Sequence, residues 1–299
     1  MRPQPLHRKL LLPLGALALA ALPVAARPAT QASAPTTATP AQATSAGAAK
    51  SAPAKPSQDA APAPPRKATP EERAEAERLE PLARAAFWAN QFQIDPHDSQ
   101  AGLHLAAALR ALGRNDEAAA TAAQVLILDP ANQGALLESA RAYLAGGQGF
   151  YAIEPLTKLR DGDPKDWRYV SLLGVAYEQV SRTEDAEAAW KQALQMSPDN
   201  PAVLSNMAMH YAARGQSSEA EQLLRQAAAQ PNAPLQVRQN LALILGLEGK
   251  LAEAEKLERQ DLPPELADAN MAYLKAASSG PHALADAGKA LAGAAAVTR

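Results

Sequence analysis

Histidine, cysteine and carboxylate side chains are the groups most often used for catalysis and metal binding, and their pattern here argues against both. The chain has 299 residues and no cysteine, which excludes disulfides, thiolate metal sites and a cysteine nucleophile. No two of its histidines have the i, i+4 spacing of a helical zinc site. They are His7, His97, His104, His210 and His282. We therefore expect no catalytic, cofactor-binding or metal-binding residues.

Two further patterns could bind phosphate or calcium, and both have a simpler structural explanation. The run Gly146-Gly147-Gln148-Gly149 follows no predicted strand and precedes no suitably placed lysine, so it does not match a phosphate-binding loop. Several aspartates fall in predicted turns without the 12-residue loop of a calcium site. They are Asp95, Asp98, Asp161, Asp163 and Asp166. We expect these carboxylates to cap helices.

The charge of the chain is unevenly distributed along the sequence. The formal net charge is −2; the segment 1–70 carries +7, so the segment 71–299 carries −9. An acidic folded region argues against nucleic acid as a partner. Hydrophobic residues make up 47% of the chain but aromatic residues only 4%, so alanine must supply much of the core. Such a composition favours closely packed helices.

A repeat of constant length organises the central part of the chain. Numbering each unit from slot 1, units begin at Ser99, Gln133, Trp167, Pro201 and Leu235. Slot 15 holds a residue that must end one helix and turn the chain into the next, for which glycine is best suited. These residues are Gly113, Gly147, Ser181, Gly215 and Gly249. Each unit begins 34 residues after the one before it, as Gln133 does after Ser99. A fixed period of this length predicts a stack of helix pairs.

Other slots carry small or large residues in the same register. Slot 20 holds Ala118, Ala152, Ala186, Ala220 and Ala254, and slot 8 holds Ala106, Ala140, Gly174, Ala208 and Ala242. Both slots are expected where the two helices of a pair approach most closely, because a larger side chain would separate them. Slot 11 holds leucine or tyrosine, and slot 32 holds proline in three units.

This pattern of slots resembles the tetratricopeptide repeat (TPR), from residue 99 to about residue 260. The resemblance implies an all-α fold: a right-handed TPR-type α-solenoid of about five helix-turn-helix repeats with helical caps. Slot 4 departs from the pattern, most of all in the fifth unit, where it holds Arg238. Helices are expected at 71–80 and 81–92 as an N-terminal cap, and at 264–277 as a C-terminal cap.

In a TPR stack the first helices form a concave wall, chiefly through slots 2, 5, 9 and 12, with slot 6 beside them. We expect this wall to bind an extended peptide or a helix, with arginines meeting acidic residues of the partner. Asn206 and Asn240 resemble asparagines that bind peptide backbone in some repeats of this family, although a local capping role is the alternative. The wall residues are Leu103, Arg110, Leu137, Arg141, Leu144, Arg168, Ser171, Val175, Glu178, Ser205, Asn206, Met209, Gln239, Asn240 and Leu243.

The segment 1–70 does not have the composition of a folded domain. A basic start, an apolar stretch over 10–22 and small residues at 24–26 predict a signal peptide, with an uncleaved membrane anchor as the alternative. Residues 27–70 are rich in Ala, Pro, Thr and Ser and predict a disordered linker. The chain should therefore be exported.

The predicted domain organisation follows from these features. It comprises a signal peptide (1–26), a linker (27–70), N-terminal capping helices (71–98), five TPR units (99–132, 133–166, 167–200, 201–234 and 235–262), and a C-terminal capping helix with a tail (263–299).

The end of the repeat region resembles a more particular family. Asp261-Leu262-Pro263 followed by Asn270, Tyr273 and Leu274 is similar to the C-terminal part of the TadD family of tight-adherence (Flp) pilus assembly proteins. The resemblance implies an assembly factor in the periplasm that acts beside an outer-membrane secretin. Many members carry a lipid-modified cysteine, which this chain lacks.

The expected partners are other proteins of an envelope secretion or pilus machine, with no nucleic acid and no small-molecule substrate. Membrane association would be indirect or through an uncleaved signal anchor. Two alternatives remain open from the sequence: a general periplasmic TPR adaptor for another envelope machine, and a regulatory subunit of an enzyme complex.

Overall fold

The computed structural model describes residues 66–278, and within this range every regular element is an α-helix. The predicted signal peptide, the linker up to residue 65 and the tail from residue 279 lie outside the described residues. No described helix is both long enough and apolar enough to cross a membrane.

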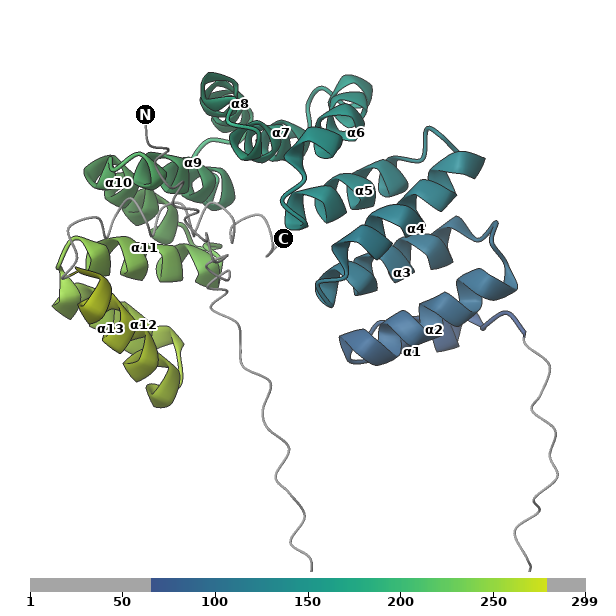
Figure 1. Ribbon diagram of the computed structural model, residues 1–299, viewed down its shortest axis with the longest axis horizontal. Coiled ribbons are helices and arrows are strands. Elements are labelled where there is room, and N and C mark those ends of the chain that lie inside the picture. The colour runs from purple at the N-terminus through teal and green to yellow at the C-terminus, as the bar shows by residue number, and fades with distance from the viewer. Residues whose placement is uncertain (1–65, 279–299) are drawn as a thin grey trace, which may run out of the picture. The chain divides into compact units, whose positions relative to one another are not determined.

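Five helix pairs of constant spacing make up the centre of the described region (Figure 1). The first helices are α3 (Ser99–Ala111), α5 (Gln133–Ala145), α7 (Trp167–Gln179), α9 (Pro201–Ala213) and α11 (Leu235–Leu247). The second helices are α4 (Asn115–Leu128), α6 (Gly149–Gly162), α8 (Thr183–Met196), α10 (Ser217–Ala228) and α12 (Leu251–Asp261). All five first helices begin at the predicted slot 1, and the predicted solenoid of helix-turn-helix repeats is confirmed.

Local chemistry explains where the first helices begin. Asp98 and Asp166 accept hydrogen bonds from the backbone N–H of Ala101 (3.0 Å) and Arg168 (2.9 Å). Asn132 and Asn200 do the same for α5 and α9. These side chains satisfy N–H groups that have no partner within the helix. Asp98 and Asp166 therefore have the capping role that the sequence suggested. The prediction for Asp161 was wrong, because it lies within a helix, Gly149–Gly162, and pairs with Arg160.

Slot 15 takes the left-handed backbone conformation in every unit. The four glycines there have φ between 71° and 79°, and Ser181 has φ 61°. In each turn the residue after slot 15 donates its N–H to the carbonyl of slot 11, as Arg114 does to Leu109 at 2.9 Å. This bond ends the first helix and directs the chain into the second helix.

The interior is built from small residues at the helix crossings. The alanines of slots 8 and 20 are completely inaccessible. Gly174 shows why slot 8 must be small, because a Cβ at this position would clash with Nε1 of the Trp190 indole. That indole is itself fixed, because its N–H donates to the carbonyl of Ser171 at 3.1 Å. Helices α7 and α8 can therefore approach closely only around a glycine.

Capping helices flank the repeats. Before them come α1 (Pro70–Ala76) and α2 (Pro81–Ile94), and after them α13 (Pro264–Ser278). The predicted first capping helix over 71–80 was too long, because α1 ends at Ala76 and a turn precedes Pro81. It begins at Pro70 with a capping box in which Thr69 and Glu72 bond each other's backbone. Helix α13 packs on α11 and α12, with Leu274 against Gly246.

Candidate protein-binding wall

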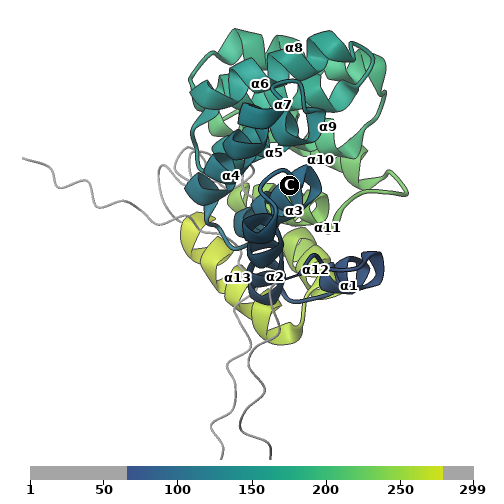
Figure 2. The same cartoon turned by 90° about the vertical axis from the view of Figure 1, so that its right-hand side faces the viewer.

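The first helices line one side of the stack and contact one another along it. Helices α3 and α5, α5 and α7, α7 and α9, and α9 and α11 are in direct contact, whereas successive second helices are farther apart (Figure 1, Figure 2). Closer spacing on one side curves a solenoid toward that side and makes it the usual binding surface. We call this side, formed by α3, α5, α7, α9 and α11, the inner wall.

The structure divides the predicted wall residues by accessibility. Arg168 is exposed. The half-buried residues are Leu103, Arg110, Leu137, Arg141, Val175, Glu178, Asn206 and Gln239; the buried residues are Leu144, Ser171, Ser205, Met209, Asn240 and Leu243. Buried side chains offer little surface to a partner, so the predicted binding role rests on the first two groups.

Arg110 and Arg141 are brought together by a carboxylate that the sequence analysis did not single out. Glu138 on α5 accepts from Nε of Arg110 on α3 at 3.3 Å and from Nη1 of Arg141 at 3.0 Å. The Glu138 side chain is only 13% exposed, and the two arginine side chains are 16% and 32% exposed. Glu138 therefore connects the two guanidinium groups across α3 and α5.

A second group of charged side chains joins α7 to α9. Glu178 accepts from Nδ1 of the buried His210 at 2.8 Å and from Nη1 of Arg214 at 3.4 Å. Burial alone would raise the pKa of Glu178, but the hydrogen bonds and charges of His210 and Arg214 outweigh it, so the pKa lies below its usual range. Glu178 is therefore an anion at neutral pH, held between two units.

Asn206 and Asn240 bond serines of the preceding unit. Asn240 Nδ2 donates to Ser205 Oγ at 3.0 Å, and Asn206 Nδ2 donates to Ser171 Oγ at 3.5 Å. The repeat explains this pairing, because slot 6 of one unit meets slot 5 of the unit before it. These hydrogen bonds connect successive first helices. They are not the local capping bonds that were the alternative to ligand binding. Ligand binding by either asparagine remains a prediction.

Arg168 points to a local partner. Its guanidinium bonds Asp166 at the beginning of α7, with Nε 2.9 Å from Oδ1, and its side chain is 60% exposed. The hydrogen bond from Arg168 helps to hold the pKa of Asp166 below its usual range. The structure thus places Arg168 apart from the pair Arg110 and Arg141, with which the sequence analysis had grouped it.

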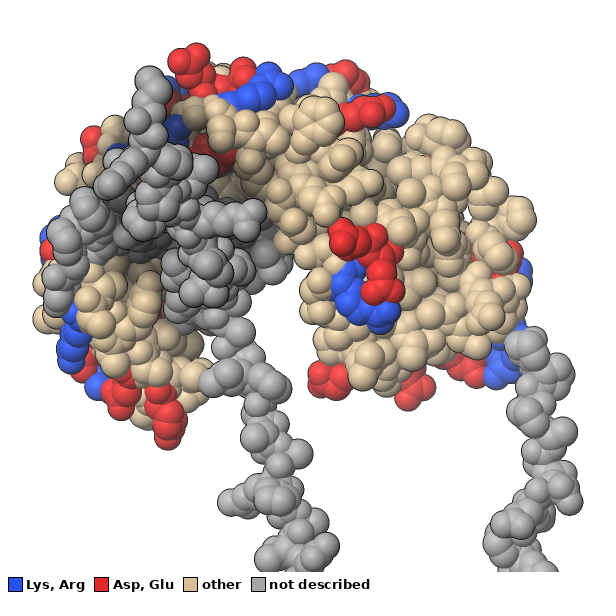
Figure 3. Space-filling view, viewed as in Figure 1, with Lys and Arg blue, Asp and Glu red and all other residues tan. Residues whose placement is uncertain are grey.

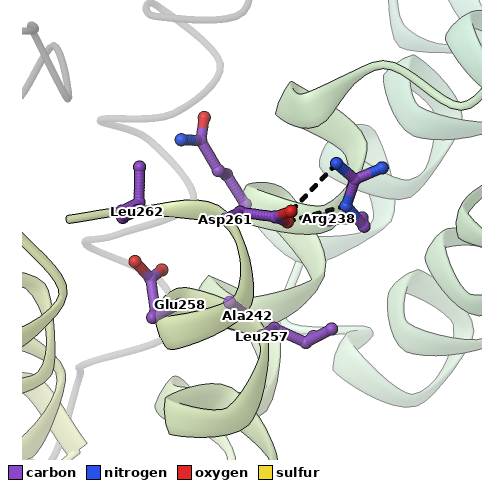
Figure 4. Close-up of a pocket in the computed structure, with 7 residues that line it drawn as sticks. Arg238, Ala242, Leu257, Glu258, Asp261 and Leu262 are labelled. Atoms are coloured by element: carbon purple, nitrogen blue, oxygen red, sulfur yellow. Dashed lines mark hydrogen bonds and ion pairs between the residues drawn. The ribbon is translucent and has the colours of Figure 1, made fainter. Parts of the chain in front are cut away.

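Arg238, the departure at slot 4 of the fifth unit, has a specific role (Figure 4). Its Nε and Nη2 donate to Oδ2 and Oδ1 of Asp261 at 2.7 and 3.0 Å, a bidentate pair between α11 and the end of α12. The small pocket around this pair also includes Glu258 and Leu262, and it has no internal space for a ligand. The arginine therefore fastens the C-terminal end of the stack.

Glu138, His210 and Arg214 are the wall residues that sequence reasoning missed. Glu138 occupies slot 6, the slot already considered for Asn206 and Asn240, so the register alone could have pointed to it. His210 and Arg214 occupy slots 10 and 14, which are not wall slots in the ordinary pattern. Within the described residues, no group of three His, Cys, Asp or Glu side chains could hold a metal ion.

The comparisons agree with this architecture. A tetratricopeptide-repeat family model matches residues 179–244. The solved structure of TTC0263, a thermophilic TPR protein in Thermus thermophilus, is similar to the chain at 26% identity with a TM-score of 0.52, over 58% of this chain and 97% of that one. The structure of MamA 41-end from Desulfovibrio magneticus RS-1 matches at 19% identity with a TM-score of 0.47, over 53% and 90%. None of the curated proteins matches. The family match and the TTC0263 fold support a TPR protein, a kind of repeat scaffold that is generally non-enzymatic and binds other proteins.

Proposed function

We propose that this protein is a scaffold of the bacterial cell envelope that holds a partner polypeptide along its inner wall. The observation that carries the proposal is the run of five first helices in mutual contact, with half-buried apolar and charged side chains along them. A wall of this kind contacts a long stretch of polypeptide and offers no convergent set of catalytic groups.

The chemistry of the first two units favours a partner with apolar and acidic residues. Leu103, Leu137 and Val175 are half-buried, so each keeps some apolar surface for a partner. A guanidinium group carries five N–H donors in a planar fork, and the 32% exposed side chain of Arg141 can present them to a carboxylate of the partner. A bidentate bond from Arg141 to that carboxylate would fix the register of a peptide or helix.

The envelope machine that we propose is a Flp-type (tight-adherence) pilus or secretion system. The support is the resemblance of the C-terminal segment to the TadD family, carried by Asp261-Leu262-Pro263, Asn270, Tyr273 and Leu274. Three of these residues have contacts at the C-terminal end of the stack: Asp261 pairs with Arg238, Asn270 with Glu258, and Leu274 with Gly246. In this proposal the chain is exported to the periplasm and reaches the outer membrane only through its partners.

Binding to purified components of the Flp machine, measured by isothermal titration calorimetry, tests the proposal. We expect one component to bind the full chain, and the double variant Arg110→Ala, Arg141→Ala to weaken binding about tenfold or more. The control is the double variant Arg160→Ala, Arg259→Ala. These arginines lie on the second helices α6 and α12 and bond Asp161 and Glu255, so binding should be unchanged.

The possible results separate the parts of the proposal. Equal binding by both double variants would remove the inner wall as the site. Binding to a different envelope machine, with loss in the wall variant, would retain the scaffold and exclude the Flp assignment. Circular dichroism on each variant shows whether helicity is intact.

A further inference from the structure

The outer side of the stack is formed by the second helices, and four slots on each recur as exposed positions. These are slots 18, 22, 25 and 29, which follow the i, i+4, i+7 spacing of one helix face. In α4, for example, they hold Asp116, Ala120, Ala123 and Ile127, all of them exposed. The same four slots can therefore be compared along the molecule from α2 to α12.

On α2 and α4 these slots are mainly apolar, whereas on α6 only Phe150 is apolar and the other three slots hold Glu154, Thr157 and Asp161. The apolar residues are Leu82, Ala86 and Ala89 on α2, and Ala120, Ala123 and Ile127 on α4. Large side chains stand out into solvent: Leu82 is 68% exposed, Ile127 77%, Leu128 52%, Phe150 71% and Tyr151 59%. These are five of the eight large apolar side chains exposed in the described part of the chain.

Between them lie exposed alanines, namely Ala83, Ala86 and Ala89 on α2 and Ala120 and Ala123 on α4. We call this surface, from Leu82 to Tyr151 across α2, α4 and the first turn of α6, the apolar band.

In the later helices eight of these twelve slots are polar or charged, and the other four hold Ala188, Ala229, Ala252 and Pro263. Helix α8 presents Glu184 and Lys191, α10 presents Gln222 and Arg225, and α12 presents Lys256 and Arg259, among others. Figure 3 shows this difference, with many charged side chains over α8 and a largely neutral surface over α4 apart from one mixed group. Nothing in the helix packing requires the difference, because these slots face away from the neighbouring helices. A polar outer face is what a solvated solenoid needs, so the apolar band calls for a partner.

We propose that the apolar band is a self-association surface through which two copies of this chain pair. The band combines large and small exposed side chains. Leu82, Ile127 and Phe150 are large, whereas Ala86 and Ala120 are small. Two such surfaces related by a two-fold axis can seat the large side chains of one copy against the alanines of the other.

Charge also favours a second copy over a charged partner. The segment 71–299 carries −9, so most contacts between two copies would be repulsive. In the apolar band Glu117 is paired with Arg114 and Glu154 with Lys158, and the exposed Asp116 accepts a hydrogen bond from the neutral amide of Gln148. The two ion pairs within each copy reduce the like charge that two copies would present to each other there.

The exposed area is large enough for a specific interface. Five large side chains that are 52–77% exposed, together with five exposed alanines, offer apolar surface on the order of 800 Å², the amount that each partner buries in a standard-size complex. Contiguous apolar patches above about 300–600 Å² are uncommon on monomeric proteins.

A matched pair of substitutions tests this inference. Ala120 and Ala188 both occupy slot 22, both are exposed, and they differ in lying inside and outside the apolar band. Analytical ultracentrifugation of the full chain up to about 200 µM detects pairing with a micromolar Kd. We expect the parent and Ala188→Asp to dimerise equally and Ala120→Asp to associate about tenfold or more weakly, because the new carboxylate would be buried without a partner. All three proteins carry the same N-terminal residues, so these cannot cause a difference between the variants.

The absence of cysteine from the chain allows a second measurement on the folded protein. In Ala120→Cys the rate of thiol labelling should fall as protein concentration rises, whereas in Ala188→Cys it should stay constant. A parent chain that remains monomeric, or equal behaviour of the two aspartate variants, would overturn the proposal. So would a monomeric chain that binds phosphatidylethanolamine–phosphatidylglycerol vesicles through Ala120, because the band would then be a lipid-binding surface.

Discussion

Slot 15 shows how a single backbone conformation selects a residue type. Four units place glycine there, and the third places Ser181, whose φ of 61° lies in the same left-handed region. Only glycine adopts this region without a steric cost from Cβ. A Cβ at Gly147 would have no heavy atom within 4 Å, so the preference for glycine comes from the backbone and not from lack of space.

Ser181→Gly should therefore stabilise the protein. Relief of the left-handed strain is expected to raise the free energy of unfolding by about 0.5–1 kcal/mol, after the greater freedom of glycine in the unfolded chain is included. Urea denaturation followed by circular dichroism measures the change. The reverse substitution, Gly147→Ser, should lower stability by a similar amount, and equal midpoints for both variants would contradict the backbone explanation.

Glu258 provides the clearest pH-dependent residue. It is 4% exposed and accepts a hydrogen bond from Asn270 Nδ2 at 2.7 Å. Burial raises the pKa of Glu258 above the ordinary range, against the opposing effect of the Asn270 bond. The native state thus holds this proton to higher pH than the unfolded chain does. Its contribution to stability falls as pH rises from about 4.3, the ordinary value, through the raised pKa.

Glu258→Gln should consequently raise the melting temperature at pH 7. The substitution removes the buried charge but keeps an oxygen that accepts from Asn270, and each kcal/mol relieved corresponds to roughly 2–4 °C in a domain of this size. The gain should shrink toward pH 4, where Glu258 is protonated in both states. Glu265→Gln is the control, because Glu265 is exposed. A gain independent of pH would show that charge is not the cause.

At the scale of helices, the sequence predicted position well and contacts poorly. The starts of α3, α5, α7, α9 and α11 were predicted because capping and turn residues recur at the same slots of every unit. The length of α1 was overestimated. The residue types after Ala76 are compatible with a helix, and only the turn before Pro81 interrupts it.

The contacts of wall side chains could not be read from slot numbers. A slot fixes the direction in which a side chain leaves its helix, but its partner lies on a helix of the neighbouring unit. Asn240 with Ser205 and Arg110 with Glu138 are such pairs, and so the accessibility of these residues was overestimated. The polar groups that suggested ligand contacts also connect repeat to repeat.

The crossing of α7 and α8 gives a test at this scale. Gly174→Ala would place Cβ in steric conflict with three atoms of the Trp190 indole, which its bond to Ser171 holds in place. Overpacking of this kind is expected to cost about 1–3 kcal/mol of unfolding free energy. Gly162→Ala at the end of α6 is the control, because no heavy atom lies within 4 Å of its Cβ and alanine favours helix. If both variants melt like the parent, the helix pair is not closely packed at slot 8.

At the scale of the whole described stack, the main contacts of each helix are with its neighbours along the chain. These contacts run from α1 to α13 between helices one or two places apart. In such a one-dimensional arrangement, the free energy of unfolding is a sum of contributions from each repeat and from each interface between neighbours. A destabilising substitution should therefore affect mainly the helices next to it. The two caps are then expected to protect different parts of the molecule.

Hydrogen–deuterium exchange can follow this separation directly. Leu274 is 2% exposed and packs on Gly246, so Leu274→Asp should release α13 and speed amide exchange in α11 and α12 while α3 and α4 keep their parent rates. Trp88 is 2% exposed at the other end, and Trp88→Ala should speed exchange in α1 to α3 and leave α11 and α12 unchanged. If either variant accelerated exchange uniformly from α1 to α13, the stack would unfold as one cooperative unit, and its stability would not be a sum over neighbouring repeats.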